Sequence, residues 1–249
     1  RKGMTLEDAE RLLKSRPYFA SQMVASGDAD GFVGGVSRNY ADVLRPTIEV
    51  IGSDTSAHCV IGCYMVNVKG KTIFLADATV NVYPDSPTLA EIAIQTAKIA
   101  RRFGVNPKVA MLSFSNFGST RAQRSTRIEE AIEIAKEIDP TLVIDGPMQA
   151  DTALKPAVQG DYPFMNFSGP ANVLVLPNLA AANIAYKLLE ELGGAEMTGP
   201  ILEGMDKPVQ LVARSDCVRH IVNMATICAA DAIRQDSYWE TLAANPESE

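Results

Sequence analysis

The sequence predicts an α/β protein with mainly parallel sheets, because short apolar segments alternate with helical patterns along nearly all of its 249 residues. The segment 109–120 shows the pattern most clearly. It begins as an apolar run, passes into Ser, Asn and Gly residues, and is followed by a helical pattern from Ala122. In an open α/β sheet, ligands bind at the carboxyl ends of the strands, where such a turn offers hydroxyls and backbone N–H groups. The alternative is an ordinary strand-to-helix loop.

Two helices, a glycine-flanked strand and a third helix are expected at the start of the chain. Thr5 and Asp8 resemble a capping box that opens the first helix. The third helix carries Arg45, and the neighbouring Pro46 predicts a kink or a second helix start. The first two helices are expected over 5–14 and 18–26, and the strand within 27–35.

Strands and helices are then expected to alternate to the end of the chain. Gly70 and Lys71 separate two strand-like runs and predict a β-hairpin. Gly104 is placed as the C-cap of a strongly periodic helix, and Pro156 interrupts a short one. The expected strands are 59–68, 72–76, 109–113, 142–144, 171–176 and 209–213, and the expected helices are 89–103, 122–138, 151–158, 183–192 and 218–234.

Composition narrows the class of protein. A formal net charge of −7 argues against a general nucleic-acid binder, which needs a basic face. There is no apolar run of about 18 residues and no signal peptide, so we expect a cytoplasmic protein without a membrane span. The chain opens at Arg1 without an initiator Met, which predicts a piece of a longer protein. Cys59 and Cys63 are interpreted as small buried thiols, because with His58 they lack a clear fourth zinc ligand.

Polar side chains gather at the predicted strand ends. Arginine binds phosphate with two parallel hydrogen bonds, and short hydroxyls and amides bind the remaining oxygens. The pattern therefore suggests an anionic, phosphate-bearing ligand; the alternative is that the arginines pair with acids at an interface. The residues are Ser113, Ser115, Asn116, Asp145, Asn178 and Arg214, joined by Arg45 from a helix.

Signals for other chemistry are poor. Ser113 and Ser115 do not lie in a G-x-S-x-G elbow, and neither a dinucleotide fingerprint nor a P-loop occurs. No acidic pair has metal-ligand spacing, so no metal site is expected. His220 could act as a base, although a surface or interface role is the better interpretation.

Several segments, taken together and in order, resemble the phosphotransacetylase/phosphotransbutyrylase superfamily. The resemblance covers nearly the whole chain, although the family's opening strand–helix segment is absent. It implies two α/β/α lobes with a cleft between them: residues 1–59 with 196–249, lacking their N-terminal part, and an inserted lobe of 60–195. Hinges are expected at Gly193–Gly194 and Gly199–Pro200. The matching segments are 27–35, 44–46, 109–119, 145–151, 177–187 and 192–208.

The family joins the CoA thiol and acetyl phosphate, and the resemblance implies roles for single residues. Its phosphate-binding arginine maps to Arg45, its Ser-Arg pair to Ala213 and Arg214, and its acidic base to His220. Alanine cannot hydrogen-bond the reacting groups, whereas a histidine could still take a proton, so loss of activity is expected. The implied ligand contacts are Arg45, Ser113, Ser115, Asn116, Ser119, Asn178 and Arg214.

Three further segments resemble the phosphotransacetylase-like domain at the C-terminus of large bacterial NADP-dependent malic enzymes: 1–3, 37–40, and Asn116–Phe117 in the loop after 113. This resemblance implies a regulatory module that senses acetyl-CoA, in a homodimer or higher homo-oligomer, without a cofactor of its own. An upstream domain would hold NADP and a divalent metal, Mg or Mn, and convert malate to pyruvate by oxidative decarboxylation. Two alternatives stay open: an active phosphate acetyl- or butyryltransferase, and a structural dimerisation module.

Overall fold

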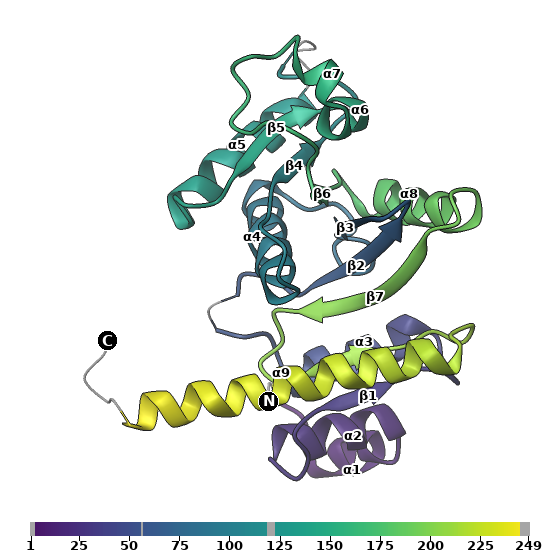
Figure 1. Cartoon of the computed structure of the whole chain (residues 1–249). Helices are drawn as coiled ribbons and strands as arrows, with labels where there is room; N and C mark the ends of the chain where they lie inside the picture. The colour runs from purple at the N-terminus through teal and green to yellow at the C-terminus, as the bar shows by residue number, and fades with distance from the viewer. Residues whose placement is uncertain (1–2, 56, 119–122, 245–249) are drawn as a thin grey trace. The chain divides into compact units, whose positions relative to one another are not determined.

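The structure is a computed structural model that describes residues 3–55, 57–118 and 123–244, with the backbone alone for 123–125 and 236–244. The chain divides into two compact units (Figure 1). Unit 1 combines Arg1–Ser56 with Met205–Glu249, and unit 2 is Ala57–Gly204. The sequence placed the return to the first lobe at residue 196, but the structure assigns 196–203 to a strand of unit 2.

Unit 1 is built on a two-stranded parallel sheet in which Phe32 pairs with Val209 and Gly34 with Leu211. The expected capping box is present, because Thr5 Oγ1 accepts a hydrogen bond of 3.2 Å from the Asp8 N–H. The helix that contains Pro46 is a single element. The elements are α1 (Leu6–Leu13), α2 (Arg16–Ala25), β1 (Phe32–Gly34), α3 (Tyr40–Val50), β8 (Val209–Leu211) and α9 (Val218–Ala244).

Unit 2 contains a six-stranded sheet in the order β5-β4-β6-β3-β2-β7. The pairs β3–β6, β6–β4 and β4–β5 are parallel, and β2 is antiparallel to β3 and to β7. The predicted α/β class, its mainly parallel order and the hairpin of β2 and β3 are therefore confirmed. The strands are β2 (Ile61–Val68), β3 (Lys71–Ala76), β4 (Val109–Leu112), β5 (Ile144–Met148), β6 (Val173–Val175) and β7 (Glu196–Glu203).

Helices cover both faces of this sheet, which explains why the described residues of β4 and β6 are all buried. Ala110 and Leu112 of β4 share a core cluster with Ala182 and Tyr186 of α8. The helices α4 and α5 pack together, and α4 contacts β6, β3 and β4 (Figure 1). The helices are α4 (Ser86–Arg102), α5 (Gln123–Ile138), α6 (Ala150–Leu154), α7 (Pro156–Gln159) and α8 (Leu179–Glu191).

The two edge strands, β5 and β7, differ from the sequence prediction, and both contain a Gly-Pro pair. Gly146–Pro147 lies opposite Met111 of β4, and Gly199–Pro200 lies opposite Tyr64 of β2, so two residues face one at each edge. Proline is tolerated at a sheet edge and at a bulge, because no ladder hydrogen bond is needed from its nitrogen. The prediction ended the first strand at residue 144 and missed the second because it treated these pairs as turns.

Candidate functional site

The loop 113–118 leaves β4 at the carboxyl edge of the parallel strands of unit 2. Two backbone hydrogen bonds fix it to the neighbouring β5: the Ser113 N–H donates to the Met148 carbonyl at 2.8 Å, and the Phe117 N–H donates to the Pro147 carbonyl at 2.7 Å. The loop is therefore held at both ends by the edge strand beside it.

Asn116 and Gln149 lock the middle of the loop. The Asn116 Oδ1 accepts from the Gln149 N–H at 2.7 Å, and the Asn116 Nδ2 donates to Gln149 Oε1 and to Tyr162 Oη, both at 3.1 Å. The Gln149 Nε2 in turn donates to the Phe114 carbonyl at 2.9 Å. The amide of Asn116, which the resemblance assigned to ligand contact, is thus occupied within the protein.

An aromatic cluster braces the end of the loop. Phe117 adopts a positive φ of 46°, a backbone conformation that residues other than glycine adopt rarely. Its ring centroid lies 5.1 Å from that of Tyr162 and 4.9 Å from that of Phe164, in tilted and edge-to-face arrangements. Tyr162 therefore supports the loop twice, through its hydroxyl on Asn116 and through its ring.

The side chains of 113–115 differ in their exposure to solvent. Ser115 is 5% exposed, and its Oγ is buried with no hydrogen-bond partner among the described residues. Phe114 is 57% exposed, and Ser113 is half-buried. A ligand at this edge therefore meets Ser113 and Phe114 first. Ser119, also predicted as a contact, lies outside the described residues.

Asn178 follows β6 at the same edge and caps a helix. Its Oδ1 accepts from the Ala181 N–H at 2.9 Å, which makes it the N-cap of α8 and starts that helix at Leu179 rather than at 183. Beside it, the Pro177 carbonyl accepts from the guanidinium of Arg127 at 2.8 Å. The side-chain oxygen of Asn178 is therefore committed to the fold.

Two buried carboxylates of unit 2 are also satisfied internally, and one of them, Asp145, lies within β5 opposite Ala110 rather than at the strand end where the sequence placed it. Asp77, after β3, is 2% exposed and accepts hydrogen bonds from the backbone N–H groups of Gly62, Thr79, Val80 and Asn81. Burial raises the pKa of Asp77, and the hydrogen bonds from Thr79 and Asn81 oppose that shift. Asp145 accepts from the N–H groups of Gly146 and Asn166 at 2.8 and 2.7 Å. Asp77 therefore ties β2 to the loop after β3, and Asp145 ties β5 to the segment at Asn166.

The remaining predicted contacts lie in unit 1. The segment that follows β8 consists of a turn and the first residues of α9, and we call it loop 212–220. Asp216 closes it: its Oδ2 accepts from the Ala213 N–H at 2.6 Å and lies 3.8 Å from His220 Nε2. The exposed Arg214 donates to the Ser37 carbonyl at 3.4 Å. Sequence reasoning missed Asp216, although its spacing of four residues from His220 was visible in the helix-start pattern.

Arg45 is exposed on α3 of unit 1, beside Tyr18. Tyr18 donates a hydrogen bond to Glu49, which raises the pKa of the phenol, and the charge of Arg45 opposes that rise. Unit 1 therefore holds both predicted arginines, and unit 2 holds the predicted serines and amides. Their convergence on one ligand stays a prediction.

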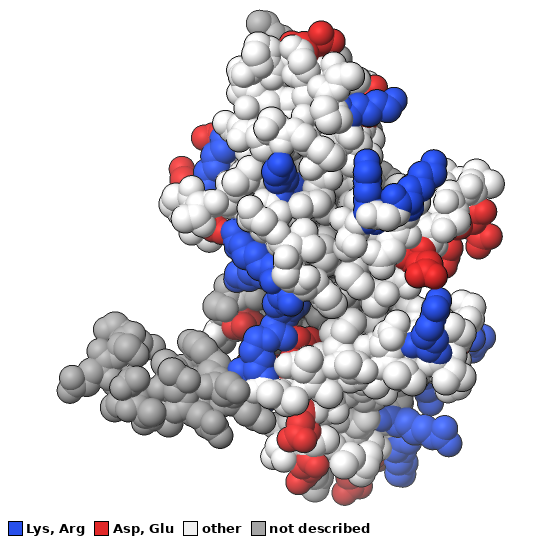
Figure 2. Space-filling view, in the orientation of Figure 1, with Lys and Arg blue, Asp and Glu red and all other residues white. Residues whose placement is uncertain are grey.

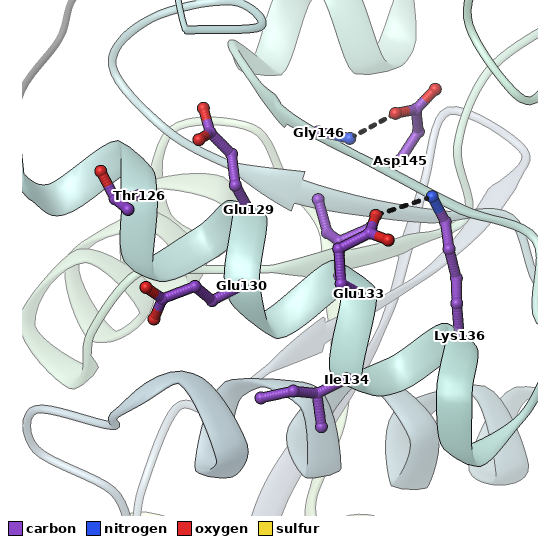
Figure 3. Close-up of a pocket in the computed structure, with 9 residues that line it drawn as sticks. Thr126, Glu129, Glu130, Glu133, Ile134, Lys136, Asp145 and Gly146 are labelled. Atoms are coloured by element: carbon purple, nitrogen blue, oxygen red, sulfur yellow. Dashed lines mark hydrogen bonds and ion pairs between the residues drawn. The ribbon is translucent and has the colours of Figure 1, made fainter.

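A cavity of about 640 Å³ lies between α5 and β5 in unit 2 (Figure 3). Glu129, Glu130, Glu133 and Asp145 line it, and Lys136 Nζ is paired with Glu133 at 3.3 Å. Carboxylates in such excess repel a phosphorylated ligand, so we do not place the predicted anion here. The part of the chain that the structure describes contains no group of three His, Cys, Asp or Glu side chains that could hold a metal ion.

The model of the family described as "Phosphate acetyl/butaryl transferase" matches residues 1–229. The chain belongs to this family. It is 42% identical over 233 residues to an NADP-dependent malic enzyme of Rhizobium meliloti. This alignment covers 93% of the chain and 30% of that enzyme. It is 39% identical over 235 residues to a phosphate acetyltransferase of Bacillus subtilis, covering 94% of the chain and 73% of the relative.

Solved phosphotransacetylases confirm the fold. The crystal structure of a phosphotransacetylase from Streptococcus pyogenes superposes with a TM-score of 0.88 at 37% identity, covering 92% of this chain and 71% of that one. The chain therefore spans less than a third of the malic enzyme it matches and about seven tenths of the transferases. Among its described residues, no helix is both long enough and apolar enough to cross a bilayer.

Proposed function

We propose that this chain is a regulatory domain of a larger NADP-dependent malic enzyme and that it binds acetyl-CoA without transforming it. The observation that carries the proposal is position 213 in the loop after β8. Alanine stands there, and its backbone N–H is directed to Asp216 at 2.6 Å. The family resemblance places the serine of an active transferase at this position, so position 213 offers no hydroxyl to hold the reacting carbonyl.

Arg214, Arg45 and Ser113 are the proposed ligand contacts. Both arginines are exposed and keep guanidinium donors for phosphate oxygens. Figure 2 shows Lys and Arg side chains interspersed with Asp and Glu on the visible face, and the net charge is −7. We therefore expect the phosphates of the ligand to be held by these individual arginines rather than by a broad basic surface.

The parent enzyme would carry its chemistry elsewhere. In this proposal, malate oxidation, NADP and the Mg or Mn ion belong to a part of the parent protein outside the 249 residues. Similarity over 30% of the malic enzyme from Rhizobium meliloti supports a module of this size within such an enzyme. Acetyl-CoA can change malate turnover only if it binds two conformations of the parent enzyme unequally.

A second candidate function is phosphate acyl transfer itself, which the pair of His220 and Asp216 favours. Asp216 Oδ2 lies 3.8 Å from His220 Nε2, which is beyond hydrogen-bond distance, so the carboxylate acts on the imidazole through its charge, and an imidazole nitrogen would accept the proton of the CoA thiol. The thiol sulfur would then bond to the carbonyl carbon of acetyl phosphate, the carbon–oxygen bond would break, and phosphate would leave. The match to 73% of the transferase from Bacillus subtilis supports this candidate equally.

Calorimetry and a thiol assay separate the two candidates. The regulatory proposal predicts saturable heat with acetyl-CoA, and no release of CoA thiol when phosphate is added. Release of thiol that disappears in Arg45→Ala establishes the transferase instead. Absence of both heat and turnover at millimolar acetyl-CoA contradicts both candidates. The structural dimerisation module would then be the remaining hypothesis.

A further inference from the structure

We infer that Phe114 contacts the CoA portion of the ligand, and that Asn116 and Gln149 act as positioning residues that turn it outward. The inference rests on the proposed function and changes the assignment of residues in loop 113–118. The resemblance pointed to Ser115 and Asn116 as ligand contacts, but the structure gives neither side chain a free polar atom at the surface.

The orientation of Phe114 follows from the hydrogen bonds around it. Gln149 Nε2 holds the Phe114 carbonyl at 2.9 Å, and Asn116 holds the Gln149 N–H at 2.7 Å. With the backbone fixed in this way, the Ser115 side chain is buried and the Phe114 ring is 57% exposed.

An exposed aromatic ring between two serines, at the carboxyl edge of a parallel sheet, is suited to a ligand that has a planar or apolar part. Burying a ring of this size removes a large apolar area from water, and stacking on a base stabilises the complex further. CoA supplies both an adenine and an apolar pantetheine chain, whereas acetyl phosphate supplies neither. The loss of the Phe114 ring should therefore weaken the binding of acetyl-CoA and not that of acetyl phosphate.

Titration of the 249-residue chain with acetyl-CoA and, separately, with acetyl phosphate tests the assignment. We expect Phe114→Ala to weaken acetyl-CoA binding about tenfold and to leave the affinity for acetyl phosphate within about twofold. Ser115→Ala is expected to leave both affinities within about twofold, because its hydroxyl is buried. Phe19→Ala, a ring of similar exposure on α2, is the matched control.

A thiol-labelling arm tests the orientation without any ligand. In a Cys217→Ser background, we expect the thiol of Phe114→Cys to react with a maleimide at least about tenfold faster than that of Ser115→Cys. Adding Asn116→Ala should reduce the difference between the two labelling rates, because the hydrogen bonds from Asn116 to Gln149 and Tyr162 are lost. Saturating acetyl-CoA should slow the labelling of Phe114→Cys.

The outcomes separate this inference from the proposed function. If acetyl-CoA binds the wild-type chain but Ser115→Ala weakens binding more than Phe114→Ala does, the inference is overturned and the proposed function stands. Equal labelling of the two thiols overturns the outward orientation of position 114, and an unchanged difference after Asn116→Ala overturns the positioning role of Asn116. If the wild-type chain gives no heat with acetyl-CoA, the proposed function fails and Phe114 loses its ligand.

Discussion

The loops 113–118 and 212–220 both follow parallel strands, but they use their polar side chains in different ways. In loop 113–118, Asn116 is bonded to Gln149 and Tyr162, and Ser115 is buried. In loop 212–220, Asp216 closes the turn on the Ala213 N–H, and Arg214 is exposed. The first loop is a braced support with an aromatic ring outward, whereas the second presents an exposed cation, Arg214, which we propose as a ligand contact.

The largest expected effect comes from restoring the family's pair in loop 212–220. We predict that Ala213→Ser combined with His220→Asp raises thiol-dependent release of phosphate from acetyl phosphate at least about 100-fold over the unmodified chain. The added hydroxyl would hydrogen-bond the reacting carbonyl, and the carboxylate would take the thiol proton. Ala213→Gly with His220→Asp is the control without a hydroxyl. Fast release by the unmodified chain would contradict the proposed loss of activity.

The next effect concerns the exposed cation of the same loop. Arg214→Met is predicted to weaken acetyl-CoA binding about 30-fold, because a hydrogen bond to a charged group contributes about 1.5–3 kcal/mol. Isothermal calorimetry measures the change. Arg11→Met, which removes a similarly exposed arginine from α1, should change the affinity less than about twofold. Equal losses in both variants would mean that only the net charge matters.

Stability should separate the two polar residues of loop 113–118. Asn116→Ala is predicted to lower the free energy of unfolding by about 1 kcal/mol, because it removes the hydrogen bonds to the Gln149 N–H and the Tyr162 hydroxyl, which water replaces in part at this partly exposed site. Ser115→Ala should keep or raise that free energy, since its buried hydroxyl makes no hydrogen bond among the described residues. Urea unfolding compares the two, and a larger loss in Ser115→Ala would show that its hydroxyl has a partner.

The smallest effect is a difference in thiol reactivity. Cys217 in loop 212–220 is exposed, whereas burial raises the pKa of Cys59 to about 12 and that of Cys228 to about 11. Burial also raises the pKa of Cys63. At pH 8 a disulfide reagent should therefore modify Cys217 first and the other three only on unfolding. Rapid reaction of Cys228 would show that α9 separates from the strand beneath it.

The alternation of apolar and helical segments was sufficient to predict the fold class and the hairpin of β2 and β3. It was not sufficient for β7, because Gly199 and Pro200 are typical of turns, and only pairing with β2 makes them part of an edge strand. The same reasoning ended β5 too early, at a Gly-Pro pair that faces Met111.

The candidate site was predictable by place but not by role. The pattern located polar residues at strand ends, and the structure puts Ser113, Asn116 and Asn178 at that edge of unit 2. What each side chain does depends on distant partners: Asn116 meets Gln149 33 residues away and Tyr162 46 residues away. No local pattern specifies such contacts, because the topology of the sheet creates them.

The most direct test follows acetyl-CoA and phosphate by ³¹P NMR in the presence of the chain, beside a calorimetric titration with acetyl-CoA. A binding module that has lost its chemistry gives saturable heat and no acetyl phosphate signal over hours. Accumulation of acetyl phosphate at a rate proportional to the protein concentration, or a titration without heat, would contradict the account.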